Sequence, residues 1–257
     1  MIVCDYQLIN FENHLFPELP LTLCVFVFLM SYYLLLRNEI VPRYAGFFAA
    51  LALLGAFLIK TTVILLLPLI VFLFINDRRQ KRHGSFWLVF VTLGVFFLLI
   101  NGFWYQEVKG SFFYRFQNIA NNHVATPKTF FDKGSIEIIK RLTYLPLLGF
   151  LKGGFFIPLM AALPALFGLK KKSFKLEKPE AFWPVASLFL LLSFWFMSTN
   201  WEYYSPLPTE NRHIVFLIPV FIMTAATFWP KLHLFEWFHQ NKLVVIGLVA
   251  LFTIPIY

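Results

Sequence analysis

One lysine interrupts a long apolar run between Tyr44 and Ile75, and it limits how this part of the chain can fold. A straight helix over the run would be about 48 Å long at 1.5 Å per residue, whereas the hydrocarbon core of a bilayer is about 30 Å thick. The run therefore predicts two short membrane helices joined by a turn at Lys60. A lysine at this turn lies at a membrane surface, where it can meet an anionic headgroup or phosphate. Snorkelling of the ammonium to the nearest interface is the alternative interpretation.

The amino-acid composition extends this conclusion to the whole chain. Of its 257 residues, 59% are hydrophobic, and they include 34 Phe, 10 Tyr and 7 Trp. Such a sequence is too apolar for a soluble domain and is typical of a multi-pass membrane protein. We expect an all-α transmembrane bundle of about eight helices, forming a single membrane domain over residues 1–257. The expected spans are Leu19–Leu36, Tyr44–Ile59, Thr61–Ile75, Phe86–Phe103, Tyr144–Leu169, Phe182–Met197, His213–Trp229 and Leu243–Tyr257.

Basic residues in the short connections predict the orientation of these spans. They fall on alternate connections, at Arg37, Arg43, residues 78–82, residues 170–172, Lys175, Lys178, Lys231 and Lys242. These connections are expected to be cytoplasmic. The N-terminus, Lys60 and the loops at about 104–143 and 198–212 then face outward. The net charge of +9 is explained by such anchors and by contact with membrane lipids, and no nucleic-acid partner is expected.

Neither a metal nor another cofactor is predicted. The two cysteines are Cys4 and Cys24, and Cys24 falls within an expected membrane helix. They support neither a disulfide framework nor a zinc site, and no acidic pair has the spacing of metal ligands.

The polar residues expected on the outer face are the candidates for a functional site. Glu18 follows Pro17 at the start of the first expected helix. A carboxylate in a first turn is favoured by the helix dipole, so a purely structural role is one interpretation. The other is that Glu18 orients a cation.

The 198–212 loop and the residue that follows it combine aromatic, acidic and basic side chains: Trp201, Glu202, Tyr203, Tyr204, Glu210, Arg212 and His213. Aromatic faces can stack on sugar rings, and an arginine can hold two phosphate oxygens at once. A solvated interfacial loop with aromatic anchors is the alternative.

The longer outer loop has its own polar cluster. His123 follows two asparagines and is the group that we expect to face a substrate, although an exposed loop histidine is the commoner case. Residues 112–119 and 136–142 predict short helices lying in the interface. The basic residues of this loop, Arg115 and Arg141 among them, are expected mainly to contact lipid headgroups.

Several of these motifs occur in a familiar order. They are Pro17-Glu18-Leu19-Pro20, Leu58-Ile59-Lys60-Thr61, Asn122-His123 and Asn211-Arg212-His213-Ile214. Together they resemble the lipid-carrier-dependent membrane glycosyltransferases of the GT-C fold, in the protein O-mannosyltransferase and aminoarabinose-transferase-like branch. The likeness extends from about residue 10 to residue 230.

The resemblance implies transfer of a sugar from a polyprenyl-phosphate donor to a lipid, glycan or protein acceptor. It places the reaction on the extracytoplasmic face of a membrane, and for this chain we expect the bacterial inner membrane. By the same resemblance Lys60 and Arg212 contact the donor phosphate, with Glu18, His123, Glu210 and His213 supporting them. The contacts to sugar or acceptor are assigned to Trp201, Tyr203 and Tyr204.

The sequence also departs from this family. The family's general base lies in a first outer loop, and the opening of this chain resembles the fourth helix, so the base is expected upstream of Met1. Three functions therefore remain open: a truncated glycosyltransferase, a non-catalytic subunit that binds a lipid phosphate, and a transporter or flippase. Few ionisable groups fall inside the expected spans, which disfavours transport.

Overall fold

The computed structural model describes residues 17–115, 117, 135–198, 204 and 206–229. Every regular element in these ranges is helical, and a single isolated bridge pairs Ser198 with Pro206. The α-helices are α2 (Glu18–Leu36), α3 (Pro42–Ile59), α4 (Leu67–Arg79), α5 (Gly84–Lys109), α7 (Ser135–Leu142), α8 (Leu145–Lys152), α9 (Phe156–Phe167), α10 (Phe182–Phe196), α11 (Asn211–Ile214) and α12 (Ile218–Phe228). Short 3-10 helices are η2 (Thr61–Leu66), η3 (Ser173–Lys175), η4 (Pro179–Ala181) and η5 (Val215–Leu217). The predicted all-α class is confirmed.

Four helices are long and apolar enough to cross a membrane: Glu18–Leu36, Pro42–Ile59, Gly84–Lys109 and Pro179–Phe196. The fold is therefore compatible with an integral membrane protein. Of the other four predicted spans, Leu243–Tyr257 lies outside the described residues. The remaining three are divided into shorter helices, among them the apolar segments Phe156–Phe167 and Arg212–Phe228.

The prediction of one continuous helix over Tyr144–Leu169 is wrong. Helix α8 ends at Lys152, and α9 begins only at Phe156. The break falls at Gly154, whose φ of 72° lies in the left-handed region that glycine adopts without steric cost. Hydropathy alone does not register this break because the segments on both sides of it are apolar.

The predicted bend at Lys60 is confirmed. Helix α3 ends at Ile59, Lys60 adopts an extended backbone with φ −155° and ψ 134°, and η2 starts at the next residue. The first half of the apolar run is held close to α5, because a Cβ at Gly46 would lie only 2.6 Å from the carbonyl oxygen of Phe86. Such close approach through small residues is how helices pack when lipid offers no hydrophobic gain.

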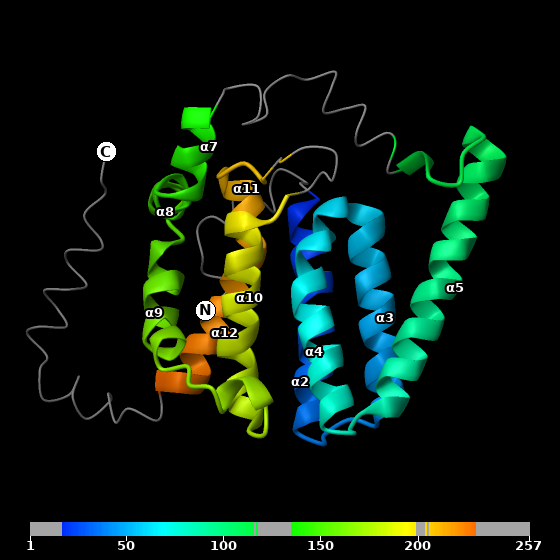
Figure 1. Cartoon of the computed structure of the whole chain (residues 1–257), viewed down its shortest axis with the longest axis horizontal. Helices are drawn as coiled ribbons and strands as arrows, with labels where there is room; N and C mark the ends of the chain where they lie inside the picture. Colours follow the sequence, from blue (N-terminus) through cyan, green and yellow to red (C-terminus); the bar gives the residue numbers. More distant parts are fainter. Residues whose placement is uncertain (1–16, 116, 118–134, 199–203, 205, 230–257) are drawn as a thin grey trace, which may run out of the picture.

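The turns of the bundle gather at two opposite ends. In Figure 1 the N-terminus of α2, the turn after α3, α7 and α11 lie at the upper end, and the turns before α3 and α5 lie at the lower end. The upper end is thus the one predicted to face outward. The side of the membrane to which each end belongs stays a prediction.

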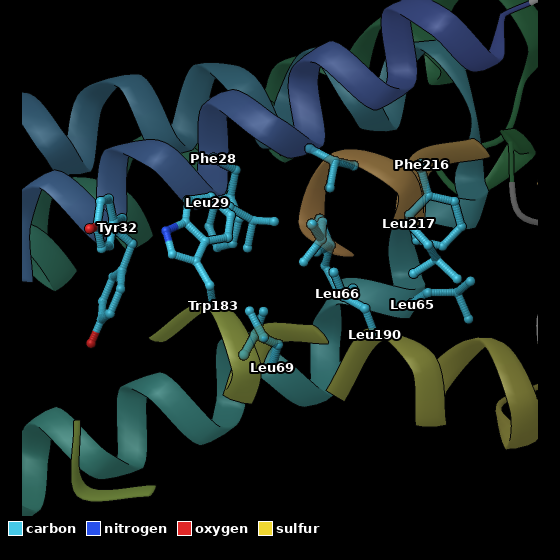
Figure 2. Packing of buried hydrophobic residues seen from close by; sticks show 14 of the residues in the cluster. Phe28, Leu29, Tyr32, Leu65, Leu66, Leu69, Trp183, Leu190, Phe216 and Leu217 are labelled. Atoms are coloured by element: carbon cyan, nitrogen blue, oxygen red, sulfur yellow. The ribbon is translucent and has the colours of Figure 1, made fainter. Parts of the chain in front are cut away.

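One apolar cluster joins the first helices of the chain to the last. Figure 2 shows side chains from α2, η2, α4, α10 and η5 meeting there: Phe28, Leu29, Tyr32, Leu65, Leu66, Leu69, Trp183, Leu190, Phe216 and Leu217. Trp183 stacks or tilts against Phe26, Tyr33 and Phe182, with ring centroids 5.3–6.0 Å apart. Aromatic pairs in this range contribute about 0.5–1.5 kcal/mol each beyond the area they bury.

A buried carboxylate fastens the lower end. Asp77, beyond the predicted end of its span, accepts hydrogen bonds from the hydroxyl of Tyr32 (2.8 Å), the indole of Trp87 (2.9 Å) and Nε of Arg82 (2.7 Å). His83 Nδ1 lies 3.2 Å from the same carboxylate. Burial raises the pKa of Asp77, but the hydrogen bonds from His83, Arg82, Trp87 and Tyr32 outweigh it, so the pKa is lowered overall. These contacts connect α2, α4 and α5.

Candidate functional site

The candidate site is built on an ion pair between Glu18 and Lys60. The ammonium Nζ of Lys60 lies 2.6 Å from Oε1 of Glu18. The Glu18 side chain is 3% exposed and that of Lys60 is 23% exposed, so the pair is buried on the acidic side and open on the basic side. Both residues were predicted from the sequence, and the structure brings them into direct contact.

Local structure explains the position of each partner. Glu18 is the first residue of α2, following Pro17, and its carboxylate lies at the positive end of the helix dipole. Lys60 caps α3, and its backbone N–H donates to the carbonyl of Ala56. A cation at a helix C-terminus is likewise favoured by the dipole. Since α2 and α3 run antiparallel and pack against each other, these two ends meet.

The pair leaves hydrogen-bonding capacity for a ligand. An ammonium has three donors, and among the described residues Nζ bonds only to Glu18. The second carboxylate oxygen of Glu18, Oε2, is buried and has no hydrogen-bond partner within the described part of the chain. Because an unsatisfied buried oxygen costs about 1–3 kcal/mol, a hydroxyl or water that reached it would stabilise the site.

His213 belongs to the same site. Its side chain is 8% exposed, and the positive charges of Lys60 and Arg212 both act on its imidazole. The backbone N–H of His213 donates to the carbonyl of Glu210, which fixes the short helix α11. His213 lies in α11, at the same end of the bundle as the N-terminus of α2 and the turn after α3 (Figure 1).

Arg212 is engaged elsewhere. Its Nε lies 2.7 Å from Oε2 of Glu210, and the two side chains are 46% and 57% exposed. This is a surface ion pair beside the buried one. The two acids of the site that the structure describes, Glu18 and Glu210, are therefore each held by a cation.

The aromatic part of the prediction is described only at Tyr204. Its hydroxyl donates to the carbonyl of Phe196 at 3.1 Å, at the C-terminus of α10, and burial raises the pKa of this hydroxyl. Trp201, Tyr203, Glu202 and His123 lie outside the described residues.

Arg141 does not have the headgroup role that was expected for most basic residues of the long outer loop. The side chain is fully buried and donates to the carbonyls of Phe194 (2.7 Å), Trp195 (3.0 Å) and Leu207 (3.0 Å). Burial lowers its pKa to about 10, although it remains charged at neutral pH. Arg141 satisfies the last carbonyls of α10, which have no partner within the helix. It therefore connects α7 to α10 and to the segment that leads to His213.

The residues described here contain no group of three or more His, Cys, Asp or Glu side chains suited to a metal ion. The chemistry available at the site is that of a cation, a carboxylate and an imidazole. No family model matches this chain, and no curated protein or solved structure is similar to it.

Proposed function

We propose that Lys60 binds the phosphate of a polyprenyl-linked sugar and that the protein acts in transfer of that sugar to a lipid, glycan or protein hydroxyl. The observation that carries the proposal is the Lys60 ammonium, which is held in place by Glu18 and has no other hydrogen-bond partner among the described residues. The motif resemblance described above supports the same assignment.

The chemistry needs a cation at this point. In the reaction the bond between the anomeric carbon and the carrier phosphate breaks, and negative charge builds up on the departing phosphate. A positioned ammonium stabilises that charge most effectively where little water competes with it. Glu18 acts as a positioning residue, because its carboxylate fixes the lysine without needing to touch the substrate.

The proposal also covers the number of membrane spans, the fold type and the orientation, which the four long helices do not determine. We propose a GT-C-type membrane domain of about eight spans in the bacterial inner membrane, with the end that carries Lys60 facing outward. Arg212 would leave its partner Glu210 and bind the phosphate together with Lys60. The attacking hydroxyl requires a general base, and we assign none among the described residues.

A non-catalytic lipid-phosphate-binding subunit is the second candidate. It is favoured because the two acids that the structure describes at the site, Glu18 and Glu210, are each engaged by a cation in an ion pair. Transport is less favoured, since each of the four candidate spans contains at most two charged side chains in its apolar window.

Binding and transfer can be tested separately. Purified protein is titrated with undecaprenyl phosphate in detergent micelles, and membranes containing it are assayed for transfer of a radiolabelled sugar from a polyprenyl-phosphate donor. Lys60→Gln is compared with Lys109→Gln, which removes an exposed lysine at the same end of the bundle. We expect only Lys60→Gln to weaken binding, by about tenfold or more, the loss typical of one charged hydrogen bond.

Each outcome points to one interpretation. Binding with transfer supports the glycosyltransferase, and binding without transfer supports the subunit. Transfer by this chain, with no second protein added, would assign the base to Glu18, Glu202 or Glu210. Equal binding by the two lysine variants and the unaltered protein would refute the phosphate site at Lys60.

A further inference from the structure

A second lipid-facing site lies between α3 and the outer half of α5. Helix α5 is 26 residues long and leans away from the bundle toward its upper end, as Figure 1 shows. The space between the two helices forms a groove of about 370 Å³, which we call the wedge. This volume falls in the range of small-molecule sites, about 300–1,000 Å³.

The walls of the wedge are almost entirely apolar. Phe57 of α3 lies on one side, and Val95, Leu98 and Leu99 of α5 lie on the other. These three α5 residues are 45–51% exposed, so the described part of the chain does not cover them. Helix α5 is one of the four candidate spans, and only 22% of its most apolar window is buried, so in a membrane this surface would be open to lipid chains.

The end of the wedge near the upper surface is closed by Phe112 and Arg115. The ring of Phe112 sits where a side chain at position 102 would be, since a Cβ on Gly102 would come within 2.2 Å of it. Small size at Gly102 therefore lets the segment after α5 fold back over the groove. This fold-back brings Arg115 to the C-terminus of α3.

Arg115 supplies a fixed positive charge at the mouth of the wedge. One terminal nitrogen donates to the carbonyls of Phe57 and Leu58, and the guanidinium lies over the Phe57 ring at 4.7 Å. No carboxylate of the described residues pairs with it. Its Nε is buried and lacks a hydrogen-bond partner within the described ranges.

We propose that the wedge binds an anionic phospholipid of the surrounding bilayer, with one acyl chain between α3 and α5 and the phosphate on Arg115. The choice of ligand follows from two features of the described residues: exposed apolar walls on a candidate span, and an arginine that none of their carboxylates pairs with. The proposal stands whether or not the protein transfers a sugar.

The test is native mass spectrometry of the full chain, titrated in micelles with phosphatidylglycerol or with phosphatidylcholine of identical acyl chains. One arginine near an anionic headgroup contributes about 1 kcal/mol, so we expect about fivefold tighter binding of phosphatidylglycerol. Arg115→Gln, which retains donors for the α3 carbonyls, should abolish this preference, whereas Arg115→Lys should keep it. Lys109→Gln is the matched control and should leave it unchanged.

The apolar walls are tested with a second pair of variants. Leu99→Trp fills the wedge and should weaken binding of both lipids, while Leu88→Trp, on the same helix but outside the wedge, should not. An unchanged preference in Arg115→Gln, or equal loss in the two tryptophan variants, would overturn the proposal. Displacement of the lipid by inorganic phosphate alone would also overturn the proposal. Contacts to the phosphate would then be enough for binding, without any contact between the wedge and an acyl chain.

Discussion

Removing the Lys60 charge should destabilise the protein more than removing both partners of the pair. Lys60→Met leaves the Glu18 carboxylate 3% exposed and without its cation. The attraction between unit charges 2.6 Å apart is about 6 kcal/mol at an effective dielectric constant of 20, and desolvation offsets part of it. Breaking one side of a buried pair costs about 3–5 kcal/mol in the free energy of unfolding, and we expect that cost for Lys60→Met.

The double variant separates charge from packing. Adding Glu18→Gln to Lys60→Met replaces the orphaned carboxylate by a neutral amide, so the cost should fall to about 1–3 kcal/mol. Glu18→Gln alone should cost about 1–2 kcal/mol, because Lys60 is partly exposed and can still reach water. The double variant is thus expected to be about 2 kcal/mol more stable than Lys60→Met.

The assay is unfolding in mixed micelles with increasing SDS, followed by circular dichroism. The pair Lys175 and Glu177 serves as the control, since its side chains are 62% and 64% exposed and 3.8 Å apart. Replacing either residue there should change stability by no more than about 1 kcal/mol. A double variant at the site whose cost equals the sum of the two single costs would refute a charged, coupled pair.

Three other predictions concern the framework of the bundle. Asp77→Asn should lower stability by about 3–5 kcal/mol at neutral pH by breaking its buried ion pair. Because the pKa of Asp77 in the folded protein is below the usual 3.8, its contribution to the free energy of unfolding is present above about pH 3.8 and is lost only in stronger acid. If Asp77→Asn and the unaltered protein had the same acid unfolding profile, this prediction would be contradicted. Arg141→Met should cost at least about 2 kcal/mol by leaving three carbonyls unpaired, and thermal unfolding no different from the unaltered protein would exclude the capping role. Gly46→Ala should cost about 1–3 kcal/mol in SDS unfolding because its Cβ meets the Phe86 backbone, whereas Gly94→Ala meets nothing within 4 Å and should be neutral or stabilising; equal effects would argue against close packing of α3 on α5.

Part of this arrangement could be predicted from hydropathy and charge. The apolar run was too long for one span, so the bend at Lys60 followed from bilayer thickness. Alternation of basic loops placed Glu18, Lys60 and His213 at one end of the bundle, and the structure has them there. Which residues share an end of the bundle depends on its topology. The pattern of apolar runs and basic loops in the sequence is a good guide to that topology.

The buried polar contacts were not predictable in this way. Asp77 lies in a strongly basic stretch that indicates a solvated cytoplasmic anchor. Its burial depends on Tyr32 and Trp87, which come from other helices. The burial of Arg141 likewise depends on distant segments, because its acceptors belong to α10 and to the segment before α11. The pair Gly153-Gly154 is a sequence signal for the break at Gly154. The continuous hydropathy of the segment nevertheless favoured one helix.

Comparison of the basic residues at the upper end indicates where a ligand can bind. All three donor nitrogens of Arg141 are used on carbonyls, and Arg212 is paired with Glu210. Lys60 and Arg115 are only partly used, and both lie at the C-terminus of α3. The negative end of a helix dipole draws cations to itself without neutralising them fully. We therefore propose that a phosphate binds where α3 ends, at the ammonium of Lys60 on one side and at the wedge on the other.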